Sequence, residues 1–584
     1  MNKQNRFLPT TKDEMHARGW DELDVVLITG DAYIDSPFMG IAVVGRILED
    51  VGLRVGIIGQ PDINSDVDVK RLGEPKLFWG VSGGSIDSMV SNYTATKKFR
   101  NDDDYTPGGK NNKRPDRATL VYTNLIRRYF KNTVPIVLGG IEASLRRLTH
   151  YDYWSNTLRK PILFDSKADY MVYGMGEQAI IDLGLYLKEG KDVRTIAGLC
   201  YISKEPVKEY LQIPSHKECL ENKEKYIDLF RVFYDNNDPM YSKGLCQEVD
   251  GRFLIQNPPS RYLEENEMDK IASYPYQRDL HPYHAKDGKV KALETIKFSI
   301  MTHHGCWGEC NYCAIAAHQG RTIRTRSEQN ILSEAKHFTT LKDFKGIISD
   351  VGGPTANMYG YECKKKMNLG TCIDNKRCVD AHRLCRTMKV DHSRNIKLLK
   401  DIRAIPKVKK AFIASGIRYD FIAADKNHGK EYLKEIIDHH ISGQMKIAPE
   451  HTSDEVLHHM GKPGKQSLIE FKKMFDDLNK TSGKKQFLTY YLIAAHPGCK
   501  ESHMHELKQF TTHELKINPE QAQVFTPTPG TYSAVMYYTE LDPFTKKKIF
   551  VEKDTLRKER QKEIVVAKKS FCKTKQNSTS GMQG

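Results

Sequence analysis

Short apolar runs alternate with amphipathic segments through the first 205 residues. Residues 40–51, between the first two runs, place apolar side chains at helical spacing. Short runs that are apolar throughout are typical of parallel strands covered on both faces. The alternation predicts βαβ units in an N-terminal domain, residues 1–205, with an α/β fold and a doubly wound parallel sheet. The runs are residues 24–29, 54–59, 77–81, 135–138 and 170–173.

Two polar stretches interrupt this pattern. Residues 96–117 are rich in Lys, Arg, Asn and Asp, a composition that predicts an exposed insertion. Residues 206–290 have no clear apolar period and contain turn-forming phrases such as Asn257-Pro258-Pro259. We therefore expect residues 206–290 to form an irregular bridge between two larger domains.

The pattern of short apolar runs resumes in the second half of the chain. Each run ends in a polar or glycine-containing turn, and helical segments such as 327–338 separate the runs. This repeat predicts a partial (β/α)6 barrel over residues 291–550. Residues 551–584 form a basic tail, which we expect to be helical to about Lys569 and disordered beyond it. The barrel runs are 296–301, 346–351, 410–414, 444–448, 487–494 and 522–525.

Length and composition limit the number of domains, the cellular location and the partners that we expect. Its 584 residues require more than one hydrophobic core. No apolar leader follows Met1 and no stretch of about 18 apolar residues occurs, so we expect a cytoplasmic protein with no membrane partner. The net charge of +16 permits RNA as a partner, and a generally lysine-rich composition explains it equally well.

Three cysteines lie close together directly after the first run of the predicted barrel. Cys306, Cys310 and Cys313 have the spacing C-x3-C-x2-C. Three thiolates on one loop can hold a [4Fe-4S] cluster and leave one iron open to a small chelating molecule. Zinc is the main alternative, but structural zinc usually takes four ligands in paired C-x2-C knuckles. A core cluster of free thiols is the remaining alternative.

The cysteine loop and the turns after the later runs resemble the YgiQ-type proteins of the radical S-adenosylmethionine (SAM) superfamily. This resemblance implies that SAM chelates the open iron, is cleaved reductively and yields a radical that abstracts hydrogen from an unknown substrate. It also implies a reductant protein of the flavodoxin or ferredoxin type. The resemblance rests on the order of the segments 305–313, 350–359, 414–420, 446–452 and 494–498.

Two other functions stay open at this point. One is a methylthiotransferase-like enzyme that modifies tRNA, in which a second cluster would supply sulfur. The other is a non-catalytic iron–sulfur protein that binds RNA or acts as a sensor. Production of 5′-deoxyadenosine after reduction would separate the enzymes from the non-catalytic protein.

The resemblance also assigns residues to the SAM site. Tyr312 occupies the aromatic position that lies near the adenine in the superfamily. Gly352 and Gly353 match the first two positions of a Gly-Gly-Glu motif that binds the SAM amino group. Pro354 stands at the glutamate position, so we expect backbone carbonyls near Gly352 and Gly353 to make that contact instead.

Polar residues that follow the barrel strands are candidates by placement, because active groups of such barrels gather at the carboxyl ends of the strands. A guanidinium and a hydroxyl there could bind the SAM carboxylate. A carboxyl group and imidazoles could handle protons or bind substrate. Hydrogen-bonded loop anchors are the alternative for each. The candidates are Ser415 and Arg418 for the carboxylate, and Glu450, His451 and His496 for catalysis.

A second group of cysteines follows the second run of the barrel. Four thiols within 363–385 suffice for an auxiliary iron–sulfur cluster or a zinc ion. Their spacing matches no common zinc knuckle, so redox-active or free thiols stay open as alternatives. The four are Cys363, Cys372, Cys378 and Cys385.

The N-terminal sheet is similar to the cobalamin-binding-type domain that precedes many radical SAM barrels. The histidine ligand motif of that domain is D-x-H-x-x-G. After the first run this chain has Asp31-Ala32-Tyr33, so a tyrosine stands where the cobalt-binding histidine is expected. On this ground cobalamin is not expected as a cofactor.

Overall fold

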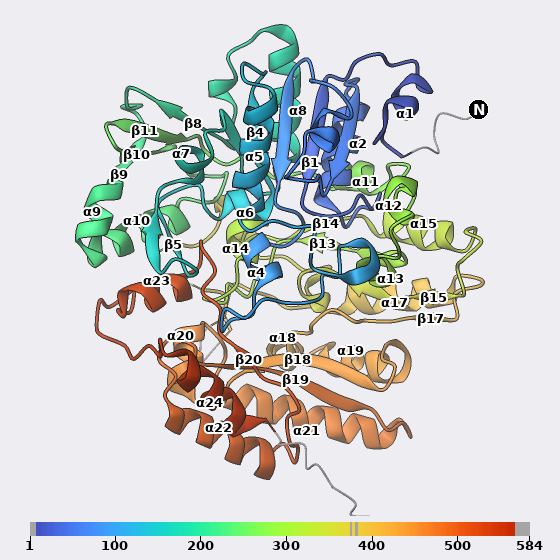
Figure 1. Cartoon of the computed structure of the whole chain (residues 1–584). Helices are drawn as coiled ribbons and strands as arrows, with labels where there is room; N and C mark the ends of the chain where they lie inside the picture. The colour runs from blue at the N-terminus through green and yellow to red at the C-terminus, as the bar shows by residue number, and fades with distance from the viewer. Residues whose placement is uncertain (1–6, 374–376, 380–383, 567–584) are drawn as a thin grey trace, which may run out of the picture.

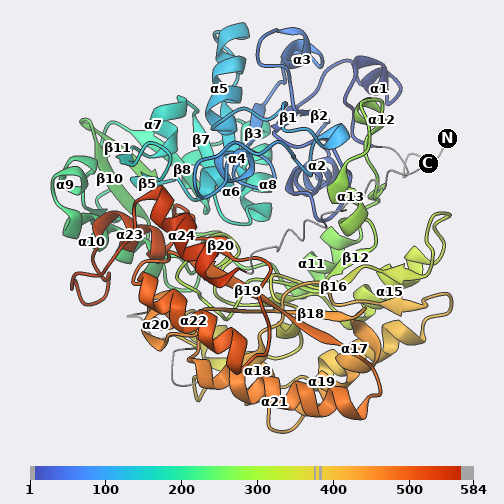
Figure 2. The same ribbon diagram turned by 60° about the horizontal axis from the view of Figure 1, so that its bottom comes forward.

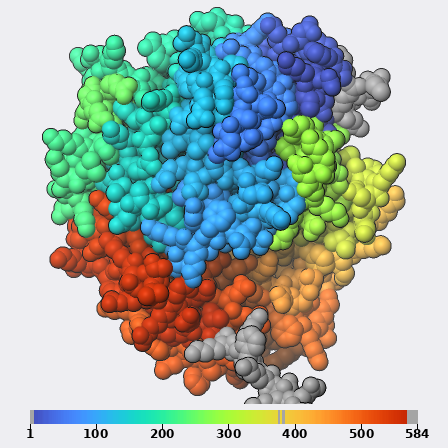
Figure 3. All heavy atoms as spheres, in the orientation of Figure 1, coloured from blue at the N-terminus to red at the C-terminus, as the bar shows by residue number. Residues whose placement is uncertain are grey.

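A computed structural model describes residues 7–373, 377–379 and 384–566. The N-terminal half forms one layer of the molecule and the C-terminal half lies below it in the view of Figure 1. The same two halves cover opposite ends of the surface in Figure 3. In the described part of the chain, every helix is too short or too polar to span a bilayer.

Nine strands form a single sheet in the N-terminal half. Their order is β2-β1-β3-β4-β7-β8-β11-β10-β9. The strands from β2 to β7 run parallel to one another, whereas β8 is antiparallel to both of its neighbours. The predicted parallel sheet is confirmed and continues into a mixed extension. The bounds are β1 Val25–Thr29, β2 Val55–Gly59, β3 Phe78–Ser82, β4 Ile136–Gly139, β7 Tyr170–Val172, β8 Leu199–Ser203, β9 Leu211–Ile213, β10 Leu245–Val249 and β11 Arg252–Gln256.

The two faces of the sheet pack on different helices. Successive side chains of a strand point to opposite faces. Leu27 therefore joins the core that includes α2 (Gly40–Asp50) and α8 (Glu177–Glu189), while Ile28 joins the core that includes α5 (Ala118–Tyr129). Cover on both faces is the reason that these strands are apolar at every position.

The segment 206–290 is more regular than its composition predicts. It supplies β9, β10 and β11 to the sheet and two consecutive helices, α9 (His216–Glu221) and α10 (Lys223–Asp235). The expectation of an irregular bridge is therefore wrong for its first half. The remainder, from 257 onward, crosses toward the barrel with only short helices such as α11 (Glu265–Ala272).

The C-terminal half forms a partial barrel of six strands in sequence order. β12 pairs with β16, and β15 pairs with β17. A bridge between Ile417 and Ile447 connects this part to β18, which is followed by β19 and β20. Every pair is parallel. β15 and β16 are two halves of one strand interrupted at Ser349. The predicted (β/α)6 architecture is confirmed. The bounds are β12 Ser299–Met301, β15 Ile347–Ile348, β16 Asp350–Gly352, β17 Lys410–Ala411, β18 Gln444–Glu450, β19 Phe487–Ala494 and β20 Gln523–Val524.

Helices separate the barrel strands and cover the outside of the barrel. Two further helices, α23 (Tyr532–Thr539) and α24 (Thr555–Val565), follow the last strand. α23 lies beside α10 of the N-terminal half in both views (Figures 1 and 2). The covering helices are α15 Glu328–Phe338, α17 Ser393–Ala404, α18 Tyr419–Ala424, α19 Gly429–Glu435, α20 Asp454–Met460, α21 Lys465–Thr481 and α22 Glu501–His513.

The polar stretch 96–117 is exposed over much of its length, as predicted, but it also places two charged residues, Asp103 and Arg114, in the interior. The side chain of Arg114 is fully buried, and its Nη2 lies 2.8 Å from Asp31 Oδ1 and 3.2 Å from Asp103 Oδ2. Its Nη1 donates to the Gly83 carbonyl oxygen at 2.9 Å. Arg114 and Asp103 are thus paired inside the protein, which composition alone does not reveal.

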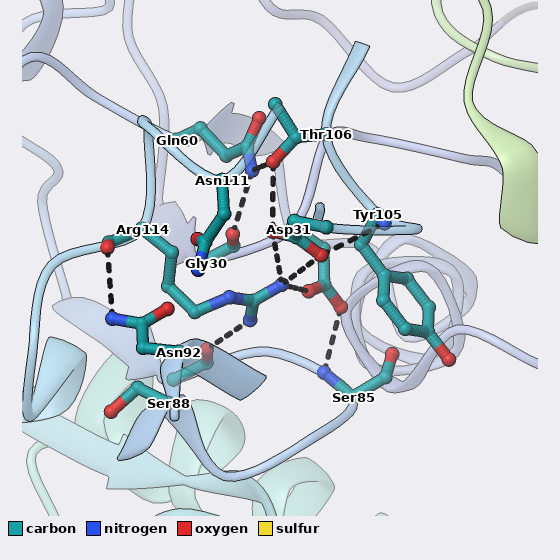
Figure 4. Close-up of polar contacts among 12 residues, drawn as sticks. Gly30, Asp31, Gln60, Ser85, Ser88, Asn92, Tyr105, Thr106, Asn111 and Arg114 are labelled. Atoms are coloured by element: carbon teal, nitrogen blue, oxygen red, sulfur yellow. Dashed lines mark hydrogen bonds and ion pairs between the residues drawn. The ribbon is translucent and has the colours of Figure 1, made fainter. Parts of the chain in front are cut away.

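This ion-pair cluster fixes the loops that follow β1 and β3. Asp31 accepts a hydrogen bond from the Ser85 backbone N–H at 2.7 Å, which joins the two loops directly (Figure 4). Gln60 Nε2, after β2, donates to the Gly30 carbonyl at 3.0 Å and to the Thr106 hydroxyl at 2.7 Å. The carboxyl edge of the parallel sheet is therefore held by buried polar contacts.

Candidate active site

The three cysteines lie on a tightly constrained loop at the carboxyl end of β12. Gly305 has φ +82°, and a side chain there would place its Cβ 2.5 Å from the Thr322 carbonyl oxygen. A Cβ on Gly308 would lie 2.3 Å from Arg418 Nη1. The Gly308 N–H donates to Cys306 Sγ at 3.3 Å. The two glycines therefore let the backbone pass close to its neighbours, and the loop presents its thiols from a fixed frame.

The three thiols do not form a ready site for a single metal ion. Among the described residues, no three Cys, His, Asp or Glu side chains converge closely enough to hold one metal ion. In a cluster each thiolate binds a different iron, so the thiols need not converge on one point. Burial raises the pKa of Cys306 and raises that of Cys313 to about 12. Iron would therefore have to displace protons from these thiols.

Arg418 lies at the cysteine loop, but its bidentate face is occupied. Its Nε and Nη2 donate to the two carboxylate oxygens of Asp420 at 2.8 and 2.7 Å. Its Nη1 lies 3.6 Å from Cys310 Sγ. The predicted bidentate contact with the SAM carboxylate is thus replaced by an internal ion pair, and Nη1 is the group directed at the loop.

Ser415, Gly352 and Gly353 hold the strand ends beside the loop. The Ser415 hydroxyl donates to Asp350, whose other oxygen accepts the Ser415 backbone N–H at 3.0 Å. The Gly352 carbonyl accepts hydrogen bonds from the N–H and the hydroxyl of Thr302 at 2.7 and 3.1 Å. A Cβ on Gly353 would meet the His303 ring at 2.7 Å. Their predicted contacts with SAM stay predictions.

Two of the three proposed catalytic residues come together around Tyr312. The Tyr312 hydroxyl donates to Glu450 Oε1 at 2.9 Å, and the His496 ring lies edge-on to the Tyr312 ring at 6.2 Å. Burial raises the pKa of Glu450. Glu450 also has φ +68°, a conformation that costs energy for a residue other than glycine. Strain of this kind is often found at functional positions.

The third proposed catalytic residue, His451, is directed elsewhere. Its Nδ1 accepts the Ser453 backbone N–H at 3.0 Å, and its Nε2 lies 3.7 Å from Cys499 Sγ. Burial lowers the pKa of His451 to about 3, so the ring is neutral at physiological pH. His451 therefore fits the role of a loop anchor better than that of a group at the cysteine loop.

Three of the four cysteines of the second group lie near one another. Cys363 and Cys378 are buried in a small core with Trp307 of the first cysteine loop, and Cys385 packs against it. The sulfurs of Cys363 and Cys385 both lie within 3.8 Å of the Thr387 hydroxyl oxygen. None of the four forms a disulfide with another described cysteine. A metal bound by them stays a prediction.

A buried charge network that the sequence did not reveal joins the two cysteine segments. Lys366 Nζ, just after Cys363, donates to Glu309 Oε1 inside the first loop at 2.7 Å, and both side chains are almost fully buried. Arg321 Nη1 lies 3.6 Å from the other Glu309 oxygen. The position of Glu309 between two cysteines was the only sequence signal for this role.

A cavity of about 430 Å³ lies between the carboxyl edge of the N-terminal sheet and the cysteine loop segment. Residues after β1 and β3, including Asp31 and Ser85, line one side of the cavity. His304, two residues before Cys306, and His318 line the other side. The cavity thus lies where the two halves of the chain face each other.

Comparison with known proteins identifies the family. The sequence model of a family described as Radical SAM N-terminal matches residues 7–299. A UPF0313 protein of Fusobacterium nucleatum is 59% identical over 565 residues, which are 97% of this chain and 99% of that protein. The chain belongs to the UPF0313 family of radical SAM proteins. A UPF0313 protein of Thermotoga neapolitana is 46% identical and covers 96% of this chain and 99% of its own length. The predicted YgiQ-type membership is confirmed.

Solved radical SAM structures resemble this UPF0313 chain more distantly. The methyltransferase TsrM from Kitasatospora setae, with cobalamin and a [4Fe-4S] cluster bound, is 14% identical with a TM-score of 0.47 and covers 87% of this chain and 77% of its own. OxsB with aqua-cobalamin bound is 12% identical with a TM-score of 0.46 and covers 90% and 57%. Scores this low carry nothing about the ligands of the UPF0313 chain.

Our expectation that cobalamin is not a cofactor is nevertheless wrong as an inference, because Tyr33, the residue on which it depends, does not line the cavity at the sheet edge. The two solved structures named above contain cobalamin. The expectation rested on position 33 alone. Tyr33 is fully buried, accepts a hydrogen bond from the Leu8 N–H at 3.2 Å and stacks on His281. It does not line the cavity at the sheet edge. The residue at position 33 is therefore no evidence about what that cavity binds.

Proposed function

We propose that the protein is a radical SAM enzyme that holds a [4Fe-4S] cluster on Cys306, Cys310 and Cys313. The observation that supports this most strongly is the constrained loop at the end of the first barrel strand, with its three thiols and the adjacent Arg418 guanidinium. When bound and reduced, such a cluster supplies the electron that splits SAM into methionine and a 5′-deoxyadenosyl radical. Because a reduced cluster needs a reducing setting, we place the enzyme in the cytoplasm with a flavodoxin- or ferredoxin-type reductant.

The residues around the loop would bind, orient and shield the reactants. Tyr312 and Glu450 share a buried hydrogen bond beside the cysteines, and the raised pKa of Glu450 favours a proton on this pair. The strand end at Gly352 and Gly353 would form the wall against which SAM lies. We assign proton handling to Glu450 and a supporting contact to His496, whose Nε2 lies 2.7 Å from the Ser533 hydroxyl.

Cleavage of SAM tests the proposal directly. The protein, reconstituted with iron and sulfide without oxygen and then reduced with dithionite, should form 5′-deoxyadenosine and methionine in equal amounts. Liquid chromatography with mass spectrometry measures both products. A protein that carries about four irons per chain and leaves SAM intact would exclude the enzyme and favour a binding or sensor role.

The packing of the second cysteine group supports a second metal site. Cys363, Cys378 and Cys385 contact the same small core as Cys306. A metal bound there would adjoin the first cluster, as a methylthiotransferase-like reaction on tRNA would require. This alternative activity therefore depends on whether these thiols, with Cys372, bind iron or zinc.

We expect a Cys306→Ala/Cys310→Ala/Cys313→Ala variant to keep iron or zinc at the second group. Further replacement of Cys363 and Cys378 should remove that residual metal, because the remaining two thiols are too few for a stable site. Metal analysis of anaerobically purified protein provides the measurement. If the triple variant is folded by circular dichroism and holds no metal, the four cysteines are free thiols and the tRNA alternative loses its support.

A further inference from the structure

The cavity at the sheet edge is placed where open parallel sheets bind ligands. In the sheet, β1 lies between β2 and β3. The chain continues from β1 to β2 on one side and later returns to β3 on the other side, so the loops after β1 and β3 lead away from each other. Both loops line the cavity, and the Arg114 cluster holds them in place (Figure 4). The wall between these loops and the helices is mainly apolar and includes Phe38 and Val137. The volume of the cavity lies in the range of small-molecule sites.

One carboxyl group in the cavity wall has no cationic partner among the described residues, and its own backbone N–H is the hydrogen-bond donor that it meets. Glu177, the first residue of α8, is 5% exposed and lines the cavity. Among the described residues, no cation or side-chain hydrogen-bond donor reaches its carboxylate. Its pKa is raised to about 7 by burial, since no positive charge offsets the loss of solvent. A buried carboxylate without a counter-charge is costly unless a ligand supplies one.

The cations nearest to this cavity are already paired. Arg326, in the cavity wall, lies 2.6 Å from Glu334 and donates to Asn330 and to the Met301 carbonyl. On the side of the cysteine loop, His318 also lines the wall, and its Nδ1 is shut from solvent and lacks a partner. Burial lowers the pKa of His318 to about 4, so its ring is neutral at pH 7 and adds no charge.

We infer that this cavity binds an amphipathic small molecule whose apolar body lies against the sheet edge and whose protonated amine pairs with Glu177. An amine supplies the positive charge and the N–H donors that the wall lacks. The site is distinct from the cluster loop, and His304, two residues before Cys306, belongs to its lining. The inference concerns binding and does not require SAM cleavage.

Three probes with the same eight-carbon body test the inference. Octylamine, octanol and octanoate are titrated by calorimetry into the full-length protein at pH 7.5, without reductant or SAM. We expect octylamine to bind at least about tenfold more tightly than octanol, because a charge-assisted hydrogen bond to a buried carboxylate is worth that much or more. Octanoate should bind weakest, since its carboxylate would face Glu177.

Three variants test whether the preference for octylamine depends on Glu177. Glu177→Gln keeps the size of the side chain and should remove the preference for octylamine over octanol. Glu189→Gln, at the exposed end of the same helix, is the matched control and should keep the preference. Ala272→Phe, in the cavity wall, should weaken all three probes together by filling the space.

Several outcomes would overturn the inference. They are no binding by any probe, equal binding of amine and alcohol to the unmodified protein, and an unchanged preference in Glu177→Gln. Because the titrations contain neither reductant nor SAM, their result is independent of SAM cleavage. A protein that binds octylamine but leaves SAM intact would keep this inference and refute the proposed enzyme.

Discussion

Replacement of Cys306, Cys310 or Cys313 by alanine should each reduce bound cluster iron from about four per chain to near zero and abolish 5′-deoxyadenosine formation. The loop offers three thiols and no fourth to take over. A metal at the second cysteine group would be a separate site and would not replace this cluster. Iron content, electron paramagnetic resonance of the reduced protein and product formation measure the effect on anaerobically purified variants.

Cys219→Ala is the matched control. Cys219 is a fully buried cysteine that lies in α9 of the N-terminal half and packs in a different core. It should lower stability by removing packed atoms and leave iron content unchanged. If any of the three loop variants retained full iron and SAM cleavage, the assignment of the cluster to this loop would be wrong.

The strands and the cysteine loop could be predicted because their signals are local. A buried parallel strand is apolar over consecutive residues, and the predicted 24–29 and 487–494 agree with β1 and β19 to within a residue. The cysteine spacing within 306–313 is likewise contained in a single loop. Such features depend little on what the rest of the chain does.

The polar interior could not be predicted, because it depends on contacts between distant segments. Arg114 is buried only because Asp31, 83 positions away, faces it across the sheet edge. Nothing in the sequence distinguishes it from the exposed basic residues around it. The same holds for Lys366, which pairs with Glu309 at a separation of 57 positions. A prediction from composition takes no account of such pairs and therefore treats both basic side chains as exposed.

Placement at strand ends predicted that Arg418 and Glu450 lie near the cysteine loop, and both contact residues of that loop. The roles assigned to them stay predictions. Placement could not show that Asp420, two residues after Arg418, occupies the guanidinium. Side-chain direction also decides between His496, which faces Tyr312, and His451, which faces Cys499. Direction of this kind depends on packing against neighbours that the sequence does not specify.

Arg114→Met should destabilise the N-terminal half by about 3–5 kcal/mol, because it removes one partner from a buried ion-pair cluster. Asp31 and Asp103, both almost fully buried, would then lie next to each other without the cation between them. The control is Arg127→Met. Arg127 also pairs with an aspartate, Asp169, but both side chains are partly exposed, so the cost should stay below about 1 kcal/mol.

Urea unfolding followed by circular dichroism compares the two variants, and hydrogen exchange shows where the loss occurs. In Arg114→Met, exchange should accelerate in the loops after β1 and β3, since Arg114 holds the Gly83 carbonyl and Asp31 holds the Ser85 N–H. Adding Asp31→Asn and Asp103→Asn should recover part of the stability, because the uncompensated charges are then removed. Equal losses in Arg114→Met and Arg127→Met would show that the cluster does not hold the sheet edge. The cavity walls would then owe their position to apolar packing alone.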